Sequence, residues 1–320
     1  MIRIIYMGTP QFAVPALESL LKGSAPGVVI PEGYEIVAVL TRQDKPTGRG
    51  QEIVFSPVKL AALQHGLHVW QPGSLKRPES IEALAAFKAD LYIVAAFGQI
   101  LPQAVLDQPR YGTLNIHASL LPRYRGVSPI SQAILQGDKE TGVTIMLLDA
   151  GVDTGPILLK RAMPLSEEET TGSLTPKLAA LGAQAIIEAL PQWIAGRLTP
   201  VPQAEQEASY THMLRKEDGL IPWHNSAIDI ARRVRAYSPW PAAYTHWRGK
   251  LIKILSAQAL ETAKIPAAAG TALLTDNKKL AVVTGEGLLV ITTLQLEGKK
   301  AVSAEEFLRG YPQFVGAVLE

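Results

Sequence analysis

The first half of the chain alternates short apolar runs, rich in β-branched residues, with segments whose leucines have helical spacing. Six of these runs have the composition of strands: Arg3–Met7, Ile36–Leu40, His68–Trp70, Leu91–Ala95, Gly112–His117 and Val143–Leu148. Strands that alternate with helices form parallel pairs, because each connection crosses the sheet through a helix. We therefore expect an α/β fold with an open, mainly parallel sheet and helices on both faces.

Two helix starts are marked by a hydroxyl residue followed by proline, at Thr9-Pro10 and Ser56-Pro57. The hydroxyl caps the first backbone N–H groups, and proline at the first helical position has no N–H to lose. We expect a helix to begin at each pair. The Met7–Pro10 turn lacks the further glycines of a dinucleotide-binding fingerprint, so the interpretation as a tight turn is at least as good as direct ligand contact.

The pattern changes near residues 191–210, which hold three prolines among Gln and Glu residues and show no hydrophobic period. Beyond this stretch, a helical segment at Ser226–Ala236 precedes short runs typical of a small β-barrel. These runs are Tyr244–Trp247, Leu251–Ala257, Thr271–Leu274, Leu280–Thr284 and Leu288–Leu294. We expect a domain over 1–190, a linker over 191–210 and a small OB-like β-barrel domain over 211–320.

Composition narrows the class of protein. The chain has 320 residues and no cysteine, which excludes disulfides, thiolate metal sites and a cysteine nucleophile. Met1–Met7 resembles a buried strand rather than a signal peptide, and no stretch approaches a membrane span, so we expect a cytoplasmic protein. No histidine lies at ligand spacing from a suitable partner, so we assign no metal site.

Positive charge is concentrated late in the chain. The formal net charge is only +2, yet residues 230–279 hold nine Lys and Arg against two Asp and Glu. Such a stretch is either a solvated face or a surface that contacts phosphates. The candidates for phosphate contact are Arg232, Arg233, Arg235, Lys250 and Lys253.

The segment Gly112–Gly126 is the most informative for chemistry. Side chains alternate along a strand, so Asn115 and His117 share one face near its carboxyl end, where open α/β sheets bind ligands. A histidine there is either a hydrogen-bonded structural residue or part of a site. The adjacent Arg123 and Arg125 leave both interpretations open.

Two further clusters lie after predicted strands. Asp149 and Asp153 stand among glycines, which is typical of a turn in which Asp side chains bond their own backbone. With a histidine nearby, one carboxylate can instead orient the imidazole. The glycine-rich basic stretch Thr41–Gln51 is either a mobile phosphate-gripping loop or a solvated one.

Together these motifs resemble the formyltetrahydrofolate-dependent formyltransferase family. Met-Gly-Thr-Pro at 7–10, the Asn-x-His strand followed by Ser-Leu-Leu-Pro-Arg-Tyr-Arg-Gly at 119–126, and Asp-x-Gly-x-Asp-Thr-Gly at 149–155 are its signatures in its order. Within the family, the chain resembles members that formylate the methionine carried by initiator tRNA. The stretch Asn225–Pro241, with Arg-Ala-Tyr-Ser-Pro-Trp-Pro, resembles the start of their C-terminal barrel.

The resemblance implies a role for particular residues. Asn115, His117 and Asp153 match the catalytic positions, and 10-formyltetrahydrofolate is the implied formyl donor. The implied folate-binding residues are Phe97, Gly98, Gln99, Ile100 and Leu101, with Ser119, Leu120, Leu121 and Pro122. Arg49 matches an arginine that contacts tRNA, and Arg42 and Lys45 lie in the same loop. We also expect a monomer, with no membrane partner and no metal.

The chain departs from the family pattern at two places. Gln51-Glu52 stands where a more basic pair often follows the loop. Pro176 falls in a segment usually read as continuous helix, and we expect that helix to begin with Thr175 as its cap.

Two other classes of function remain as alternatives. One is a formyltransferase that uses the same donor on a sugar nucleotide or another amine; such enzymes are expected to lack the Lys45–Gly50 loop. The other is a catalytically silent RNA-binding protein, which has no need of three converging polar groups at Asn115, His117 and Asp153.

Overall fold

The computed structural model describes residues 1–23, 33–47, 52–262 and 266–320, which form two compact units. Unit 1 consists of Met1–Pro129, Glu140–Pro164 and Thr175–Thr211; unit 2 consists of Ile130–Lys139, Leu165–Leu174 and His212–Glu320. The division of the chain into a catalytic domain at 1–190, a linker at 191–210 and a tRNA-binding domain at 211–320 stays a prediction.

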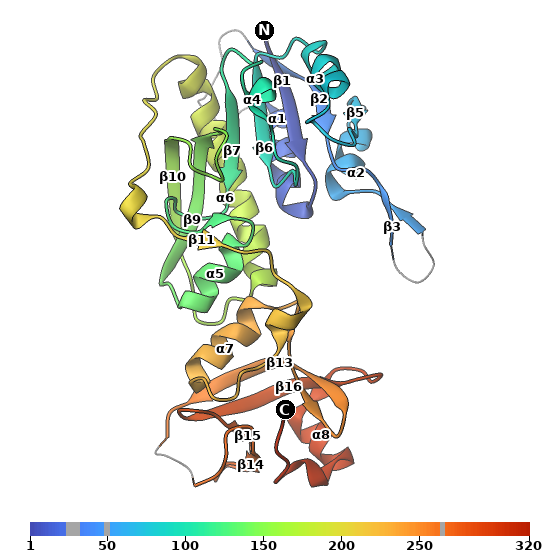
Figure 1. Cartoon of the computed structure of the whole chain (residues 1–320), viewed down its shortest axis with the longest axis vertical. Helices are drawn as coiled ribbons and strands as arrows, with labels where there is room; N and C mark the ends of the chain where they lie inside the picture. Colours follow the sequence, from blue (N-terminus) through green and yellow to red (C-terminus); the bar gives the residue numbers. More distant parts are fainter. Residues whose placement is uncertain (24–32, 48–51, 263–265) are drawn as a thin grey trace. The chain divides into compact units, whose positions relative to one another are not determined.

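Unit 1 is built on a seven-stranded sheet in the order β10-β9-β7-β6-β1-β2-β5 (Figure 1). Its strands are β1 (Ile2–Gly8), β2 (Tyr34–Leu40), β5 (Val69–Trp70), β6 (Leu91–Ala95), β7 (Thr113–His117), β9 (Glu140–Leu147) and β10 (Ile157–Pro164). The pairs from β7 through β5 are parallel, whereas β9 is antiparallel to both neighbours. The mainly parallel sheet is confirmed, and β10 is an edge strand that the sequence pattern did not predict.

Helices cover both faces of this sheet. The face that carries Met7 and Val94 packs against apolar side chains of α3 (Pro78–Ala85) and α4 (Gln103–Leu106). Two further helices, α1 (Val14–Lys22) and α2 (Pro57–Gln64), follow β1 and precede β5 along the chain.

The opposite face of β7 lies against α6 (Thr171–Ile194). A Cβ placed on Gly182 of this helix would lie 2.8 Å from Cγ2 of Ile116, closer than side chains pack. Because glycine has no Cβ, α6 can pass directly behind the strand that carries Asn115 and His117.

The two predicted helix starts have different outcomes. Ser56 caps α2 as expected, since its hydroxyl accepts a hydrogen bond from the Lys59 N–H at 3.1 Å. The start at Thr9 is wrong. The Thr9 hydroxyl instead donates to the Phe97 carbonyl at 2.8 Å, and the chain makes the short 3-10 turn η1 (Gln11–Ala13) before α1 begins.

The predicted start of α6 at Thr175 is also wrong, because the helix begins at Thr171. Thr170 and Ser173 bond each other's backbone N–H groups through their hydroxyls, at 3.1 and 3.0 Å. This reciprocal capping satisfies N–H groups one turn earlier, so Pro176 lies inside the helix.

Two small sheets complete unit 1. The predicted loop at Thr41–Gln51 is in part a hairpin of β3 (Lys45–Thr47) and β4 (Glu52–Val54), which projects from the main sheet in Figure 1. The strands β8 (Arg125–Gly126) and β11 (Tyr210–Thr211) pair in parallel. This pairing and a backbone bridge from Val201 to Ile157 pack residues 201–211, which include the 3-10 turn η2 (Glu205–Glu207), against the rest of unit 1.

Unit 2 contains a curled antiparallel sheet in the order β12-β13-β16-β15-β14, with β17 beside β16. Its strands are β12 (Ala243–Trp247), β13 (Lys250–Leu260), β14 (Ala272–Leu274), β15 (Leu280–Val283), β16 (Leu288–Leu296) and β17 (Val302–Ser303). The pairing of β13 with β16 shifts register on both sides of Ser256, which is the kind of irregularity that bends a sheet. The predicted small barrel is present as a half-barrel.

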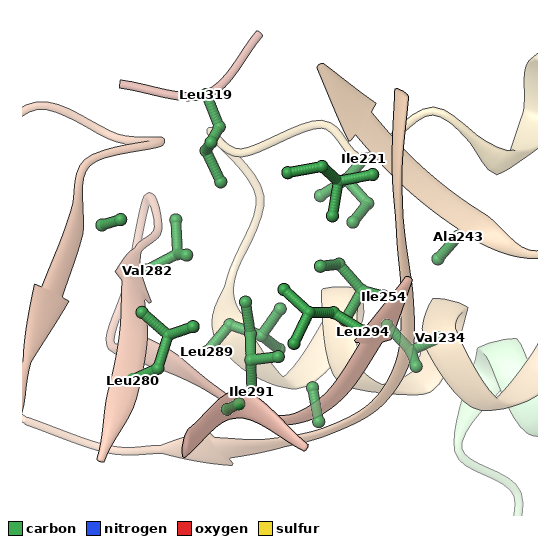
Figure 2. Close-up of a cluster of buried hydrophobic side chains, with 14 of the residues drawn as sticks. Ile221, Val234, Ala243, Ile254, Leu280, Val282, Leu289, Ile291, Leu294 and Leu319 are labelled. Carbon is green, nitrogen blue, oxygen red and sulfur yellow. The ribbon is translucent and has the colours of Figure 1, made fainter. Parts of the chain in front are cut away.

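Apolar side chains fill the inside of this curl. Figure 2 shows Val282, Leu289 and Leu294 pointing into the same space as Ile221 and Leu319. The unit's helices and turns are α5 (Pro129–Gln136), α7 (Ala227–Ala236), α8 (Ala304–Gly310), η3 (Lys216–Gly219) and η4 (Pro312–Phe314). Among the helices of the described residues, none has both the length and the apolar character needed to span a bilayer.

Candidate active site

Asn115 and His117 lie on one face of β7, and both side chains are buried. The imidazole Nε2 of His117 lies 2.9 Å from the Tyr124 carbonyl oxygen. A carbonyl can only accept, so Nε2 carries the hydrogen of this bond. The ring is therefore held from the loop that follows β7.

Asp153 reaches this pair from the loop after β9. Its Oδ1 accepts a hydrogen bond from Asn115 Nδ2 at 3.4 Å, and its Oδ2 lies 3.6 Å from His117 Nδ1. Its Oδ2 also accepts a hydrogen bond from the Gly126 N–H at 2.8 Å. One carboxylate thus faces an amide, an imidazole and a backbone N–H.

The sequence did not show that Asp153 would lie beside His117, because β9 runs in the opposite direction to β7. Because β9 runs antiparallel to β7, Leu147 at its end pairs with Leu114 near the start of β7. The loop must therefore turn back along β7 to bring Asp153 beside His117. The Asp153 backbone has φ of +52°, a left-handed conformation that side-chain-bearing residues adopt uncommonly.

These groups suit the stabilisation of negative charge beside a proton-carrying ring. Both ring nitrogens of His117 face acceptors, the Tyr124 carbonyl and the Asp153 carboxylate. The carboxylate, 3.6 Å from Nδ1, is close enough to offset a positive charge on the ring during a reaction. The second predicted carboxylate, Asp149, instead accepts hydrogen bonds from the Gly151 N–H and the Thr154 hydroxyl, as expected for a turn.

Arg125 lies next to the site, but its side chain is used in contacts that hold the fold together. Its side chain is fully buried and donates to both carboxylate oxygens of Glu205, each at 2.9 Å, and to the Tyr210 hydroxyl at 2.7 Å. The hydrogen bond from Arg125 holds the pKa of the Glu205 carboxyl below its usual range. The hydrogen bond to Glu205 in turn raises the pKa of Arg125.

The predicted folate residues divide into two groups. Gly98, Gln99 and Ile100 line a cavity of about 480 Å³, whereas Phe97 and Leu101 are buried in the apolar core beneath it. The Gln99 side chain is fixed by a bond to the Leu75 N–H and another to the Pro72 carbonyl.

The four residues Ser119, Leu120, Leu121 and Pro122 are not part of that cavity's lining. Ser119 donates to the Arg123 carbonyl at 2.6 Å, and Leu121 packs against Met146 and Ile157. Their described contacts shape the loop that also presents the Tyr124 carbonyl to His117.

The basic loop residues lie at the same cavity. Arg42 and Lys45 line its wall, together with Lys76. Arg42 packs so closely on Gly98 that a Cβ there would lie 3.0 Å from its Cδ. Arg49 lies outside the described residues.

In unit 2 the three predicted arginines of α7 make different contacts. Arg233 donates to the Asp218 carbonyl, and Arg235 donates to the Glu169 carbonyl at 3.0 Å. Burial lowers the pKa of Arg235, with nearby Arg232 adding to the shift. Arg232 and Arg235 line a cavity of about 1260 Å³ within unit 2.

Lys250 and Lys253 lie on β13, where Lys250 is exposed and Lys253 is half-buried. The structure thus places these two lysines on β13 and the three arginines on α7. Within the described residues, no group of three or more His, Asp or Glu side chains is placed to hold a metal ion.

Sequence reasoning missed the contribution of residues 201–211 to the site. Gln203 donates to the carbonyls of Asp153 and Gly155, at 2.8 and 2.7 Å, and accepts from Arg125 Nε at 3.0 Å. Ser209 accepts from the Tyr124 N–H through its hydroxyl at 2.9 Å. The one available signal was a run of amide and acidic side chains directly after Pro202, and a solvated linker has the same pattern.

Comparison with known proteins places the chain among formyl transferases. A family model described as formyl transferase matches residues 2–190, and one described as formyl transferase, C-terminal domain, matches residues 213–312. A methionyl-tRNA formyltransferase from Citrifermentans bemidjiense is 45% identical over 99% of this chain and 96% of its own length. Another from Roseiflexus castenholzii is 46% identical over 97% of this chain and 96% of its own.

Solved structures share the fold at lower identity. An N-formyltransferase from Helicobacter canadensis, solved with folinic acid and dTDP-3-aminofucose, has a TM-score of 0.65 and 19% identity. The match covers 91% of this chain and 98% of that one. At this identity the likeness concerns the fold alone.

Proposed function

Because this chain belongs to the formyl transferase family, we propose that it transfers a formyl group from 10-formyltetrahydrofolate to the α-amino group of methionine on initiator tRNA. Relatives that carry this activity in their names are 45% and 46% identical over nearly the whole chain. The observation that carries the proposal within the molecule is the convergence of Asn115, His117 and Asp153 at one end of β7.

The reaction requires a neutral amine to attack the formyl carbon. A new C–N bond forms, the carbonyl oxygen becomes a tetrahedral oxyanion, and the bond from carbon to the folate nitrogen then breaks. The amine loses a proton and the leaving nitrogen gains one. Donors placed at the oxyanion are each worth about a hundred- to thousand-fold in rate.

Asn115 and His117 are the proposed donors. Asn115 uses one amide hydrogen on Asp153, which leaves the second for substrate. His117 Nε2 faces the Tyr124 carbonyl, so an oxyanion must share or take over that donor. Asp153 would keep the ring oriented and offset its positive charge.

The substrates have proposed places in unit 1. We assign folate to the neighbourhood of Phe97–Leu101 and Ser119–Pro122, and the acceptor end of tRNA to the basic loop with Arg42, Lys45 and Arg49. In unit 2, phosphate contacts are proposed at Arg232, Arg233 and Arg235, with Lys250 and Lys253. Since charged tRNA is a cytoplasmic substrate, we propose that the protein acts there, as a monomer.

One experiment separates this function from its rivals. The protein is given 10-formyltetrahydrofolate with charged initiator tRNA, charged elongator methionine tRNA, free methionine or a dTDP-amino sugar, and formylated product is measured. Fast turnover with initiator tRNA alone is the expected result. Turnover only with the sugar nucleotide would identify the alternative formyltransferase, and tRNA binding without turnover would identify a silent RNA-binding protein.

A further inference from the structure

Asp153 depends for its position on contacts outside the loop that carries it. Its backbone is left-handed, and a conformation of this kind persists only where surrounding contacts hold it. The Gly126 N–H holds its carboxylate at 2.8 Å. Its backbone carbonyl is held by a residue 50 positions later, Gln203.

Gln203 directs both of its amide hydrogens at this loop. Nε2 donates to the carbonyls of Asp153 and Gly155, at 2.8 and 2.7 Å, which lie on either side of Thr154. A primary amide has two N–H groups, so its donor capacity is fully used here. Because the two hydrogen bonds reach carbonyls two residues apart, they fix the direction of the backbone through Thr154 as well as its position.

The acceptor side of the same amide is anchored to a buried cation. Gln203 Oε1 accepts from Arg125 Nε at 3.0 Å, and the Arg125 side chain is fully buried with two bonds to Glu205. Arg125 directly precedes Gly126, whose N–H binds the Asp153 carboxylate. The backbone and the carboxylate of Asp153 are therefore tied to the same short strand, β8.

We propose that Gln203 is a positioning residue that, braced by Arg125, keeps the Asp153 carboxylate turned toward His117. It acts through Asp153 and has no contact with the reacting atoms. Without its two bonds, the 149–155 loop relaxes and the carboxylate leaves the imidazole. This inference rests on the proposed function only where it is tested by kinetics, because kcat can be measured only if the protein catalyses formyl transfer.

The test uses two substitutions of the full chain. Gln203→Met keeps the size of the side chain but removes all three hydrogen bonds. Gln203→Glu keeps an acceptor for Arg125 but removes both donors to the loop. Each variant is expected to lower kcat about tenfold or more, by analogy with the outer-shell residues that orient metal ligands, and to leave KM for both substrates unchanged.

A matched control separates positioning from general stability. Gln108 also bridges two groups of unit 1, accepting from the Tyr92 hydroxyl at 2.6 Å and donating to the Ile81 carbonyl at 3.0 Å. Gln108→Met removes a similar set of bonds away from the site. It is expected to lower the melting temperature and leave kcat unchanged.

The NMR chemical shifts of the His117 imidazole supply a readout that does not require turnover. These shifts report the contact between the ring and the Asp153 carboxylate, so they should change in Gln203→Met and not in Gln108→Met. Unchanged kcat in the Gln203 variants, or a fall in kcat with unchanged His117 shifts, would overturn the inference. If the wild-type protein fails to formylate methionyl-tRNA, the proposed function fails while the chemical shifts still test the role of Gln203.

Discussion

Asn115 and Asp153, 38 residues apart in the sequence, are joined side chain to side chain, with Nδ2 and Oδ1 3.4 Å apart. The other oxygen of the same carboxylate lies 3.6 Å from His117 Nδ1. The side chains of Asn115 and His117 are therefore held relative to each other by the Asp153 carboxylate as well as by the strand that carries both.

His117→Ala and Asp153→Ala should abolish formyl transfer and leave the protein folded. Removing a proton-transfer group or its orienting partner costs roughly 10²–10⁴-fold in rate or more. Formylation of charged initiator tRNA and a thermal melt would be measured on each variant. Near wild-type turnover in either variant, with a cooperative melt, would show that the catalytic assignment is wrong.

Neutralising the basic loop should affect tRNA and spare folate. Arg49→Ala and Lys45→Ala are each expected to raise KM for charged tRNA or lower kcat, because each removes a charge available to a phosphate. Folate affinity, measured by fluorescence titration, should stay unchanged, and Lys22→Ala provides an exposed lysine control elsewhere in unit 1. Equal damage to folate binding would assign the loop to the folate site instead.

Salt dependence should distinguish the lysines of unit 2 from its arginines. Replacing Lys250 and Lys253 with glutamine should reduce the slope of log K against log salt for tRNA by about 1 to 2, at somewhat less than one counterion for each contact. Lys22→Gln with Lys88→Gln, the same charge change at two exposed sites in unit 1, is the control. An unchanged slope in the Lys250/Lys253 variant would exclude these phosphate contacts.

The three arginines of α7 provide the complementary measurement. Arg233 and Arg235 donate to backbone carbonyls of unit 2, and Arg232 lies 3.8 Å from Asp229. Neutralising all three should lower the melting temperature. If they also contact tRNA, the slope of log K against log salt falls by up to about 2 as well. An unchanged melting temperature together with an unchanged slope would contradict both the structural role and the phosphate contacts.

Acid should remove the stabilising effect of Glu205. Its hydrogen bond from Arg125 lowers its pKa in the folded protein, so the pair adds stability at all pH values above the ordinary glutamate pKa of about 4.3. That contribution is lost as pH falls through the lower folded value. The melting temperature of Glu205→Gln should lie below wild type at pH 7, and the two should converge in acid.

The expected difference is small because the Glu205 side chain is 71% exposed. Glu207→Gln changes the same charge two residues away and serves as the control. A gap between wild type and Glu205→Gln that persists or widens on acidification would contradict the ion-pair explanation.

The sequence predicted β7 and the start of α2 because both depend on residues that are close together in the chain. Alternation alone places Asn115 and His117 on one face, and the Ser56 hydroxyl needs only the next turn of its own chain. β10 was missed because its residues 157–164 mix charged and apolar side chains at the edge of the sheet.

Other features depend on partners far along the chain. Thr9 binds a carbonyl 88 residues later, so the local capping pattern did not predict its contact. Gln203 and Arg125 are 78 residues apart, and a glutamine among prolines has the same local pattern in a free linker. The family resemblance indicated Asp153, whereas only the folded backbone shows what holds it.

The alignment of Asn115 and His117 with Asp153 depends on Gly182, which lies behind β7 on α6. Asn115 and His117 belong to one rigid strand, while Asp153 is carried by a separate loop, so the spacing between these two parts changes if β7 alone is displaced. A single methyl group at position 182 would press on Ile116 from behind and push the strand relative to the loop. The protein would then keep all three proposed catalytic side chains and still lose their alignment.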